Sequence, residues 1–500
     1  MRVNPFGGPV ARAQFVLGRD LTLGTLLQRL AAFHGGGRLA TEADGGDLTY
    51  SDAAARVARW AGAVARRVGP GDRVVLALAN TYDLLLACLA VSRAGALPVP
   101  VNDRMRPDEV EHVIADSGAH LVVRDLAELD GGEALAVAAP AQPGDIAALF
   151  YTSGTTGKPK GAELTHRALI GAVNAGAAWP EYLRRDEAVV GLPIAHIMGF
   201  AALVGLGCAG IPVYFLPRFR PTDVLDAIEQ RRSSLFIGVP AMYRMMWEAG
   251  AAERDLSSVR AWISGADAMP ADLAAEFRRL GATATLPVVG PVGDALFVEG
   301  YGMVETGGAA AAKLSVPVVG DSLLPLPGYA FRVVDDAGDD VAVGAEGELW
   351  MKGPGVLKGY WGSPEATADA VTADGWLRTG DLVRKGMFGT ATFAGRKKDV
   401  FMHGGYSVYA REVEAALEEH PDVLEAAVVG LPDDVKGAVP AAAVRVADDS
   451  ELTPDALVAW AGGRLSAYKA PQRALFVDEL PRTGTTKVQK REVLALFAEE

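Results

Sequence analysis

The eleven residues Tyr151–Gly161 combine the residue types that bind a polyphosphate. They read Tyr-Thr-Ser-Gly-Thr-Thr-Gly-Lys-Pro-Lys-Gly and contain three glycines and two lysines. Glycines let backbone N–H groups approach a ligand closely, hydroxyl groups donate to phosphate oxygens, and lysines offset their charge. The residues before the loop, 145–151, are predicted to form a buried strand, and residues 162–175 to form more ordered structure. The pattern therefore predicts a phosphate-binding loop that follows a strand.

This loop differs from the P-loop of nucleotide hydrolases. A P-loop places four residues between its first glycine and a Gly-Lys pair, which Ser or Thr then follows. Here only two threonines separate Gly154 from Gly157, and a proline follows Lys158. A glycine-rich surface turn is the alternative, and it is the weaker explanation for a match of this length.

Composition and charge narrow the class of protein. The chain has 500 residues, half of them hydrophobic, which is ordinary for a globular protein of several domains. A net charge of −14 argues against a nucleic-acid partner, because phosphate backbones favour an excess of Lys and Arg. Cys88 and Cys208 both lie in apolar runs, so we expect both to be core residues and not to form a disulfide. Two such cysteines are typical of a protein in a reducing compartment. Residues 1–20 contain no continuous apolar segment, so we expect no signal peptide and a cytoplasmic protein.

Residues 188–217 contain no Asp, Glu, Lys or Arg, and this length raises the question of a membrane span. The stretch also contains three prolines and five glycines, which a spanning helix rarely accommodates together. A strand, a loop, a short helix and a second strand, all buried in an α/β core, explain it better. We therefore expect no stable membrane span.

The pattern along the chain predicts an α/β fold. A helix over 51–68 with Ser51 as N-cap, a strand over 72–78 and a helix over 82–94 begin an alternation that implies a parallel sheet with covering helices. Residues 281–296 are rich in Gly, Pro and Val and are predicted to be an insertion of unknown use. After Gly328 short strands separated by turns predict a small β subdomain.

Several short motifs occur together in one order. They are the loop 151–161, Pro193-Ile-Ala-His196, Ser264-Gly-Ala266, Tyr301-Gly-Met-Val-Glu305, Arg378-Thr-Gly-Asp381, Gly395-Arg396, Gly404-Gly405 and Pro481-Arg-Thr-Gly-Thr-Thr-Lys487. Their joint occurrence resembles the adenylate-forming superfamily of acyl-CoA synthetases, adenylation domains and luciferases, over essentially the whole chain. Any single motif would be weak evidence alone, since each also fits a surface turn or a capping residue.

The resemblance implies a reaction and a domain organisation. Members activate a carboxylate with ATP and Mg²⁺ to an acyl-adenylate and pyrophosphate, and then pass the acyl group to a thiol such as CoA. The implied fold has a large N-terminal domain over 1–395, built of parallel and mixed sheets with covering helices and including the β subdomain. A hinge over 396–399, with Lys398 at its centre, leads to a small mobile α+β C-terminal domain over 400–500.

The resemblance also implies an ATP site. The loop matches the stretch that holds the β- and γ-phosphates, Tyr301 matches the ring on adenine, and Asp381 matches the clamp on the ribose. The implied ATP-binding residues are Thr152, Ser153, Gly154, Thr155, Thr156, Gly157, Lys158, Lys160, Gly265, Ala266, Tyr301, Gly302, Met303, Val304, Asp381 and Arg396. Glu305 and Thr156 are the implied Mg²⁺ ligands, since hard ions prefer oxygen.

Three implied catalytic residues are Glu305, His196 and Lys487. Negative charge builds up as the carboxylate attacks the α-phosphorus, and an ammonium group there lowers the barrier. Lys487 follows Leu480-Pro-Arg-Thr, as the family's active-site lysine does, although the family usually has glycine where this chain has Thr486. His196 matches a residue where the acyl pocket meets the thiol tunnel.

A second departure from the family is Val304. The family usually has threonine here, with a hydroxyl that reaches the α-phosphate, and valine is nearly isosteric but cannot donate. We expect the α-phosphate to be held more weakly by about one neutral hydrogen bond, ~0.5–1.5 kcal/mol. The neighbouring Thr306 is a candidate for supplying the missing hydroxyl.

The implied acyl pocket and thiol site are lined mainly by small and apolar residues. The acyl-pocket residues are His196, Phe200, Gly238, Val239, Gly300 and Gly307, and the CoA-binding residues are Gly404, Gly405 and Tyr406. A missing side chain at Gly405 would leave a narrow passage for the pantetheine arm. Malonate-activating relatives have arginine at the position of Gly300, so a dicarboxylic acid is disfavoured.

The sequence therefore predicts an ATP-dependent acid–CoA ligase for a hydrophobic monocarboxylate. Small pocket residues favour a medium or long fatty acid weakly over an aryl acid. A stand-alone ligase that loads a carrier protein and a non-catalytic nucleotide-binding homologue are the other candidates. Chain length, the thiol acceptor and the choice between monomer and homodimer stay open.

Overall fold

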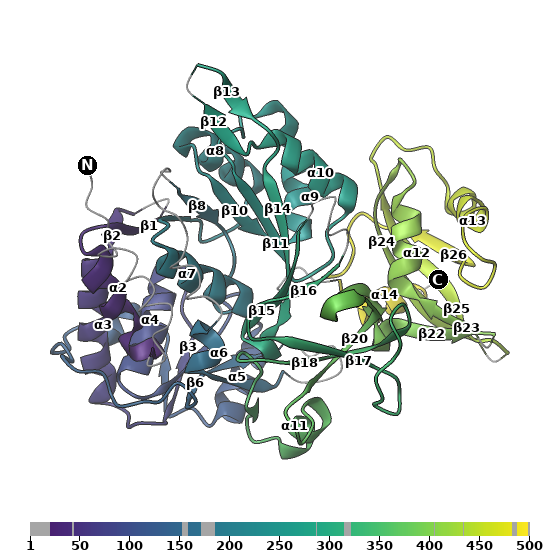
Figure 1. Ribbon diagram of the computed structural model, residues 1–500. Coiled ribbons are helices and arrows are strands. Elements are labelled where there is room, and N and C mark those ends of the chain that lie inside the picture. The colour runs from purple at the N-terminus through teal and green to yellow at the C-terminus, as the bar shows by residue number, and fades with distance from the viewer. Residues whose placement is uncertain are drawn as a thin grey trace. The chain divides into compact units, whose positions relative to one another are not determined.

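The computed structural model describes residues 21–42, 45–152, 159–171, 186–286, 288–314, 322–404, 406–433, 435–482 and 488–498. These residues form two compact units, both visible in Figure 1. One unit contains the described residues up to Ala330 together with Lys352–Leu377. The other contains Phe331–Met351 and the described residues from Arg378 onward. The hinge over 396–399 and the boundaries on either side of it stay predictions.

A nine-stranded sheet forms the centre of the first unit. Its order is β16-β15-β14-β11-β10-β8-β9-β1-β2. The strands are β1 (Arg38–Glu42), β2 (Asp47–Thr49), β8 (Ala188–Val190), β9 (Val213–Phe215), β10 (Leu235–Gly238), β11 (Ala261–Gly265), β14 (Leu296–Met303), β15 (Gly308–Leu314) and β16 (Leu324–Pro325). Strands β14 through β1 run parallel, and the strands at both edges are antiparallel. The predicted α/β class with a mixed sheet is confirmed.

Helices cover this sheet because its parallel strands are apolar along their whole length. Every residue of β10 is buried, which is typical of strands covered on both faces. The adjoining helices are α7 (Ile197–Ala209), α8 (Pro221–Arg231), α9 (Pro240–Glu248) and α10 (Ala271–Leu280). Tyr243 of α9 and Trp262 of β11 each lie with their ring centroids 5.0 Å from that of Phe277 on α10. This aromatic cluster fixes α9 and α10 against the strands.

Two smaller sheets, of three strands each, also belong to the first unit. One is parallel, in the order β4-β3-β5, and the other is antiparallel, in the order β19-β7-β6. Their strands are β3 (Arg73–Leu76), β4 (Leu97–Pro100), β5 (Leu121–Val123), β6 (Ile146–Tyr151), β7 (Gly161–Thr165) and β19 (Gly359–Tyr360). The neighbouring helices are α2 (Leu23–His34), α3 (Tyr50–Ala65), α4 (Tyr82–Arg93), α5 (Pro107–Ser117), α6 (His166–Ile170) and α11 (Pro364–Ala370).

The uncharged stretch 188–217 folds as the sequence predicts. It forms β8, a loop, α7 and β9, with both strands in the central sheet. Among the described residues, no helix is both long and apolar enough to cross a membrane.

The prediction that Ser51 is the N-cap of the helix over 51–68 is wrong. Helix α3 begins one residue earlier, and the side chain of Thr49, not Ser51, accepts the N–H of Asp52.

The predicted insertion 281–296 contains a β-hairpin. Strands β12 (Ala284–Leu286) and β13 (Gly290–Val292) pair antiparallel with each other in a sheet of their own. Val288 and Val289 at the turn are exposed. The segment therefore projects from the core between α10 and β14 rather than contributing a strand to the central sheet.

The second unit contains two sheets. The four-stranded sheet has the order β17-β18-β20-β21, and the five-stranded sheet has the order β23-β22-β25-β24 with β26 beside β25. Their strands are β17 (Ala330–Val334), β18 (Glu346–Lys352), β20 (Leu377–Lys385), β21 (Ala391–Arg396), β22 (Val400–His403), β23 (Tyr406–Tyr409), β24 (Val423–Asp433), β25 (Gly437–Val446) and β26 (Arg473–Phe476). The helices are α12 (Ala410–Glu418), α13 (Pro454–Gly462) and α14 (Lys490–Leu496).

Alternate residues of β24 face opposite sides of the five-stranded sheet. Val428 packs in one cluster with Leu417 of α12 and Leu457 of α13. The neighbouring Val429 packs in another cluster, with Val493 of α14. The two-residue period of the strand therefore gives this sheet apolar faces on both sides, and helices cover both.

Burial of His166 predicts a loss of stability in acid. The Nδ1 atom of His166 accepts the N–H of Leu23 at 3.1 Å, and burial lowers the pKa of the ring to about 4, although Asp145 acts in the opposite direction. An unfolded histidine has a pKa of about 6.5, so the unfolded state binds more protons between those values. The contribution of His166 is therefore fully present above about pH 6.5 and falls by roughly 3 kcal/mol as the pH approaches 4.

Chemical denaturation between pH 8 and pH 4.5 would measure this effect. His166→Asn, whose amide oxygen can replace Nδ1 as acceptor, should flatten the decline in unfolding free energy. The control His120→Asn changes a ring that is 44% exposed and should keep the decline. An equal pH dependence in His166→Asn and the native protein would contradict the explanation.

Candidate active site

The carboxyl ends of three parallel strands bring several predicted residues to one edge of the central sheet. Gly238 at the end of β10 pairs with Ser264 of β11, and Gly265 of β11 pairs with Gly300 of β14. Ligands of open α/β sheets bind outside such carboxyl ends. The structure thus places Gly238, Gly265 and Gly300 on neighbouring strands. Their assignment to the acyl pocket (Gly238 and Gly300) and to the ATP site (Gly265) stays a prediction.

The backbone at this edge lies close to other atoms. A Cβ atom at Gly265 would lie 3.1 Å from the carbonyl oxygen of Gly300 and 3.3 Å from the terminal methyl group of Met198 on α7. Ala266 has a φ of 70°, which is unusual for a residue with a side chain. A side chain at position 265 would therefore crowd both the β14 backbone and the side chain of Met198.

The loop after β8 presents His196 at the start of α7. Its Nδ1 atom accepts the N–H of Met198 at 3.3 Å, so the histidine caps the helix. Phe200, one turn later, is fully buried and packs edge-to-face on Phe150 of β6, with 5.2 Å between ring centroids. Val239, the residue between β10 and α9, is also buried, but its side chain makes no capping hydrogen bond. These three predicted acyl-pocket residues therefore all have structural contacts of their own.

The motif Tyr301–Glu305 spans the end of β14 and a short 3₁₀ turn, η5 (Val304–Thr306). Only glycine fits on either side of the turn. A Cβ at Gly302 would lie 2.0 Å from the carbonyl oxygen of Gly308, and one at Gly307 would lie 2.7 Å from that of Ala168. Gly307 also has a φ of 63°. The backbone therefore requires glycine at position 307, and its assignment to the acyl pocket stays a prediction.

Thr306 does not supply the hydroxyl that Val304 lacks. Its own hydroxyl is buried, accepts the N–H of Met303 at 2.9 Å and lies 2.7 Å from the carbonyl oxygen of Gly308. These bonds close the turn between β14 and β15, so that expectation is wrong. Val304 is partly buried and packs against the hydrophobic core of the unit.

Glu305 is held by a residue that the sequence did not single out. The hydroxyl of Tyr360 on β19 donates to Oε1 of Glu305 at 2.7 Å. The ammonium group of Lys160 lies 5.5 Å from the centroid of the same ring. Nothing in the local sequence distinguishes Tyr360 from other strand aromatics, because its partner lies 55 residues away.

The donor set fits Mg²⁺ that is bound chiefly through a nucleotide. Among the described residues there is no group of three or more His, Cys, Asp or Glu side chains that could hold a metal ion. Mg²⁺ commonly uses one or two carboxylates plus substrate phosphates and water. The Glu305 carboxylate is suited to such a shared site, whereas a metal held by protein alone would need more ligands.

The predicted phosphate-binding loop is flanked by an antiparallel pair of strands. Tyr151 of β6 pairs with Gly161 of β7, and the N–H of Thr152 donates to the carbonyl oxygen of Lys160 at 3.0 Å. The structure after the loop is thus a strand followed by the short helix α6. Six predicted loop residues, Ser153, Gly154, Thr155, Thr156, Gly157 and Lys158, lie outside the described residues, as do Gly405 and Lys487.

Predicted ribose contacts pair with each other in the second unit. Asp381 of β20 stands opposite Arg396 of β21, and Oδ1 of the fully buried carboxylate lies 2.8 Å from Nε of the arginine. Lys398 lies in the short turn η7 (Lys397–Asp399). Gly404 has a φ of 57°, and Tyr406 stacks on Tyr468 with 4.7 Å between ring centroids.

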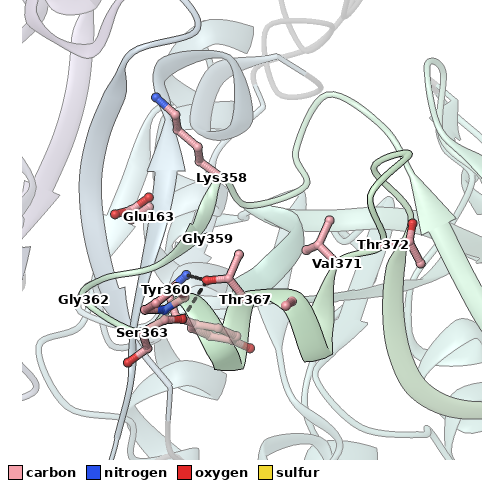
Figure 2. A pocket seen from close by; sticks show the side chains of 11 residues that line it. Glu163, Lys358, Gly359, Tyr360, Gly362, Ser363, Thr367, Val371 and Thr372 are labelled. Carbon is pink, nitrogen blue, oxygen red and sulfur yellow. Dashed lines mark hydrogen bonds between the residues drawn. The ribbon is translucent and has the colours of Figure 1, made fainter.

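A surface depression of about 510 Å³ lies along β7, β19 and α11, open to solvent (Figure 2). It is lined by Glu163, Lys358, Gly359, Tyr360, Gly362, Ser363, Pro364, Thr367, Ala368, Val371 and Thr372. Burial raises the pKa of Glu163, although the charge of Lys358 acts in the opposite direction. None of the predicted acyl-pocket residues lines this depression, so it is a separate feature that shares Tyr360 with the Glu305 site.

Comparison with known proteins covers nearly the whole chain. The family model of AMP-binding enzymes matches residues 27–137 and 127–361, and that of the AMP-binding enzyme C-terminal domain matches 412–487. A feruloyl-CoA synthase of Amycolatopsis sp is 36% identical, over 90% of this chain and 94% of that protein. A long-chain-fatty-acid–CoA ligase of Mycobacterium tuberculosis is 31% identical, over 89% and 92%.

A solved structure agrees with these relatives. The o-succinylbenzoate CoA synthetase of Bacillus subtilis, in complex with its acyl-adenylate intermediate, has a TM-score of 0.82 and 26% identity. The likeness covers 95% of this chain and 98% of that one. With its adenylation motifs placed on this shared fold, the chain belongs to the AMP-binding enzyme family, within the adenylate-forming superfamily of acyl-CoA synthetases.

Proposed function

We propose that this AMP-forming acid–CoA ligase activates a hydrophobic monocarboxylic acid, and that the acid carries an aromatic ring. The observation that supports this choice is the pair of glycines, Gly265 and Gly300, side by side on β11 and β14. Two neighbouring residues without side chains leave a flat surface, which suits a planar ring. The thioether of Met198 lies beside Gly265, and sulfur makes favourable contacts with aromatic rings.

The nature of the relatives supports an aryl acid over the alkyl chain that the sequence alone favoured. The relative with 36% identity is a feruloyl-CoA synthase, and feruloyl is an aromatic acyl group. A long-chain-fatty-acid–CoA ligase is 31% identical over a similar length, so a fatty acid is the second candidate.

A dicarboxylic acid remains disfavoured. Its second carboxylate would need a cation in the pocket, and position 300 is glycine. Lys313 on β15 lies opposite Glu299 and pairs with it at 2.9 Å, with both side chains mostly buried. The charge of Lys313 is therefore already paired with Glu299 and is not available for a second substrate carboxylate.

The nucleotide roles follow from the chemistry of each group. Glu305 would hold Mg²⁺ together with the phosphates, and the ion supplies charge that stabilises the leaving pyrophosphate. The buried Asp381 carboxylate would accept from the ribose hydroxyls, with Arg396 holding it in place. Lys487 would stabilise the charge on the α-phosphate during attack.

Pyrophosphate exchange with a panel of acids tests the proposal. The purified protein is given ATP, Mg²⁺, labelled pyrophosphate and one acid at a time, for which we choose ferulate, indoleacetate, laurate, palmitate and malonate. We expect the fastest exchange with an aryl acid, slower exchange with the fatty acids and none with malonate.

The acceptor is tested by adding CoA or a phosphopantetheinyl carrier protein to the best acid. CoA-dependent AMP release should exceed release with the carrier protein. Absence of exchange with every acid would overturn the enzymatic proposal, and fastest exchange with palmitate would replace the aryl acid by a fatty acid.

Two substitutions should separate the two half-reactions. Lys487→Ala should abolish adenylate formation yet form thioester from supplied acyl-adenylate and CoA. Gly405→Leu should keep pyrophosphate exchange but lose thioester formation, because a side chain would block the pantetheine passage. Equal loss of both half-reactions in either variant would argue against this division of roles and against domain movement about Lys398.

Restoring the missing hydroxyl at position 304 should strengthen ATP binding or turnover. Val304→Thr keeps the shape that packs on the core and adds a donor worth ~0.5–1.5 kcal/mol. We therefore expect kcat/KM for ATP in the exchange assay to rise by about twofold to tenfold. Val304→Ala, which lacks the hydroxyl, is the control. An unchanged adenylation rate and ATP KM in Val304→Thr would rule the idea out.

A further inference from the structure

The segment Leu357–Trp361 joins the Glu305 turn to the strand that follows the phosphate loop. The N–H of Leu357 donates to the carbonyl oxygen of Glu305 at 2.8 Å. Four residues on, the N–H of Trp361 donates to the carbonyl oxygen of Gly161 at 2.8 Å, where β7 begins. Between these bonds, Tyr360 pairs with Ala162 of β7. One short segment therefore fixes the carboxylate turn relative to the base of the loop.

The side chain of Tyr360 makes the same connection between charged groups. Its hydroxyl donates to Oε1 of Glu305, and its ring faces the Lys160 ammonium group, at the 2.7 Å and 5.5 Å given above. A cation within about 6 Å of an aromatic centroid is attracted to the ring. The tyrosine thus contacts both the carboxylate and a cation of the loop.

The backbone of Tyr360 is itself held in place. Its N–H donates to Oγ1 of Thr367 at 2.8 Å, and that hydroxyl donates to the carbonyl oxygen of Ser363 at 2.9 Å, as the dashed lines in Figure 2 show. Ser363 is the N-cap of α11, Thr367 lies one turn further along that helix, and both line the surface depression. The position of the phenol ring is therefore set by a helix end rather than by its contact with Glu305 alone.

The hydroxyl of Tyr360 is the donor in its bond with Glu305, because an ionised carboxylate only accepts hydrogen bonds. A carboxylate has two oxygens, and the bond uses only Oε1.

We propose that Tyr360 is a positioning residue for Glu305, holding its carboxylate ready to bind Mg²⁺ together with the nucleotide. The proposal rests on the proposed function, in which Glu305 is the Mg²⁺ ligand. Partners behind a metal ligand fix its orientation, and their loss commonly weakens metal binding or activity by about 10- to 100-fold. Without its hydroxyl partner, the carboxylate would have to be ordered at the moment of binding.

Calorimetric titration of a non-hydrolysable ATP analogue at a series of Mg²⁺ concentrations tests this. Tyr360→Phe removes one oxygen and should raise the Mg²⁺ concentration for half-maximal binding by about tenfold. Binding of the analogue in EDTA should not change. The matched control is Tyr50→Phe, which also loses a buried hydroxyl, one that donates to the carbonyl oxygen of Gly207 at 2.8 Å. That variant should lose some stability and keep the native Mg²⁺ dependence.

An unchanged Mg²⁺ requirement in a folded Tyr360→Phe would overturn the proposal, as would an equal shift in Tyr50→Phe. Should Tyr360→Phe not fold, Thr367→Val removes the bond that anchors the Tyr360 backbone, and it should shift the Mg²⁺ requirement about threefold, somewhat below the effect of a direct partner. No shift in that variant would also overturn the proposal. Failure of the proposed function is seen separately, as native protein that binds the analogue with Mg²⁺ but exchanges pyrophosphate with no acid.

Discussion

Close approach of backbone to backbone is the constraint on which the candidate active site depends. The turn that carries Glu305 has a carbonyl oxygen of β15 where a Cβ of residue 302 would lie, and a carbonyl oxygen of α6 where a Cβ of residue 307 would lie. Any side chain at either position would push the strand or the helix away. The buried Thr306 hydroxyl then closes the turn from inside. The glycines of this motif thus determine where the carboxylate stands.

Three side chains of the proposed active site are held by neighbouring residues in the absence of substrate. Glu305 accepts from Tyr360, Asp381 pairs with Arg396, and His196 caps a helix through its ring nitrogen. Groups held in this way lose less freedom when the substrate binds, which lowers the barrier to reaction. The chain carries a net charge of −14, so an anionic nucleotide gains little from long-range attraction. In the proposed function, nucleotide binding would therefore depend on these local groups and on the lysines of the predicted phosphate-binding loop.

Much of the fold follows from patterns that are local in the sequence. Alternation of short apolar strands with helices predicts the parallel sheet, and the prolines and glycines in 188–217 correctly exclude a membrane helix there. The sequence is less informative where the secondary structure of a segment depends on partners far away in the chain. Residues 161–165 form a strand because they pair with β6 and with β19, which lies nearly two hundred positions later in the chain. The sequence alone predicts ordered structure there without distinguishing a strand from a helix. The N-cap error, in contrast, is local: the side chain of Thr49, just before helix α3, accepts the N–H of Asp52 in place of Ser51.

The sequence by itself determined the family, the order of the adenylation motifs and the residue types that they supply, because each motif is a short run with its own chemistry. Only the tertiary structure decided which hydrogen bonds these side chains make. The Thr306 hydroxyl is bonded within its own turn, and the Tyr360 hydroxyl donates to Glu305, which lies 55 residues away in the chain. Such contacts arise when strands from separate parts of the chain pair, and no local pattern records them.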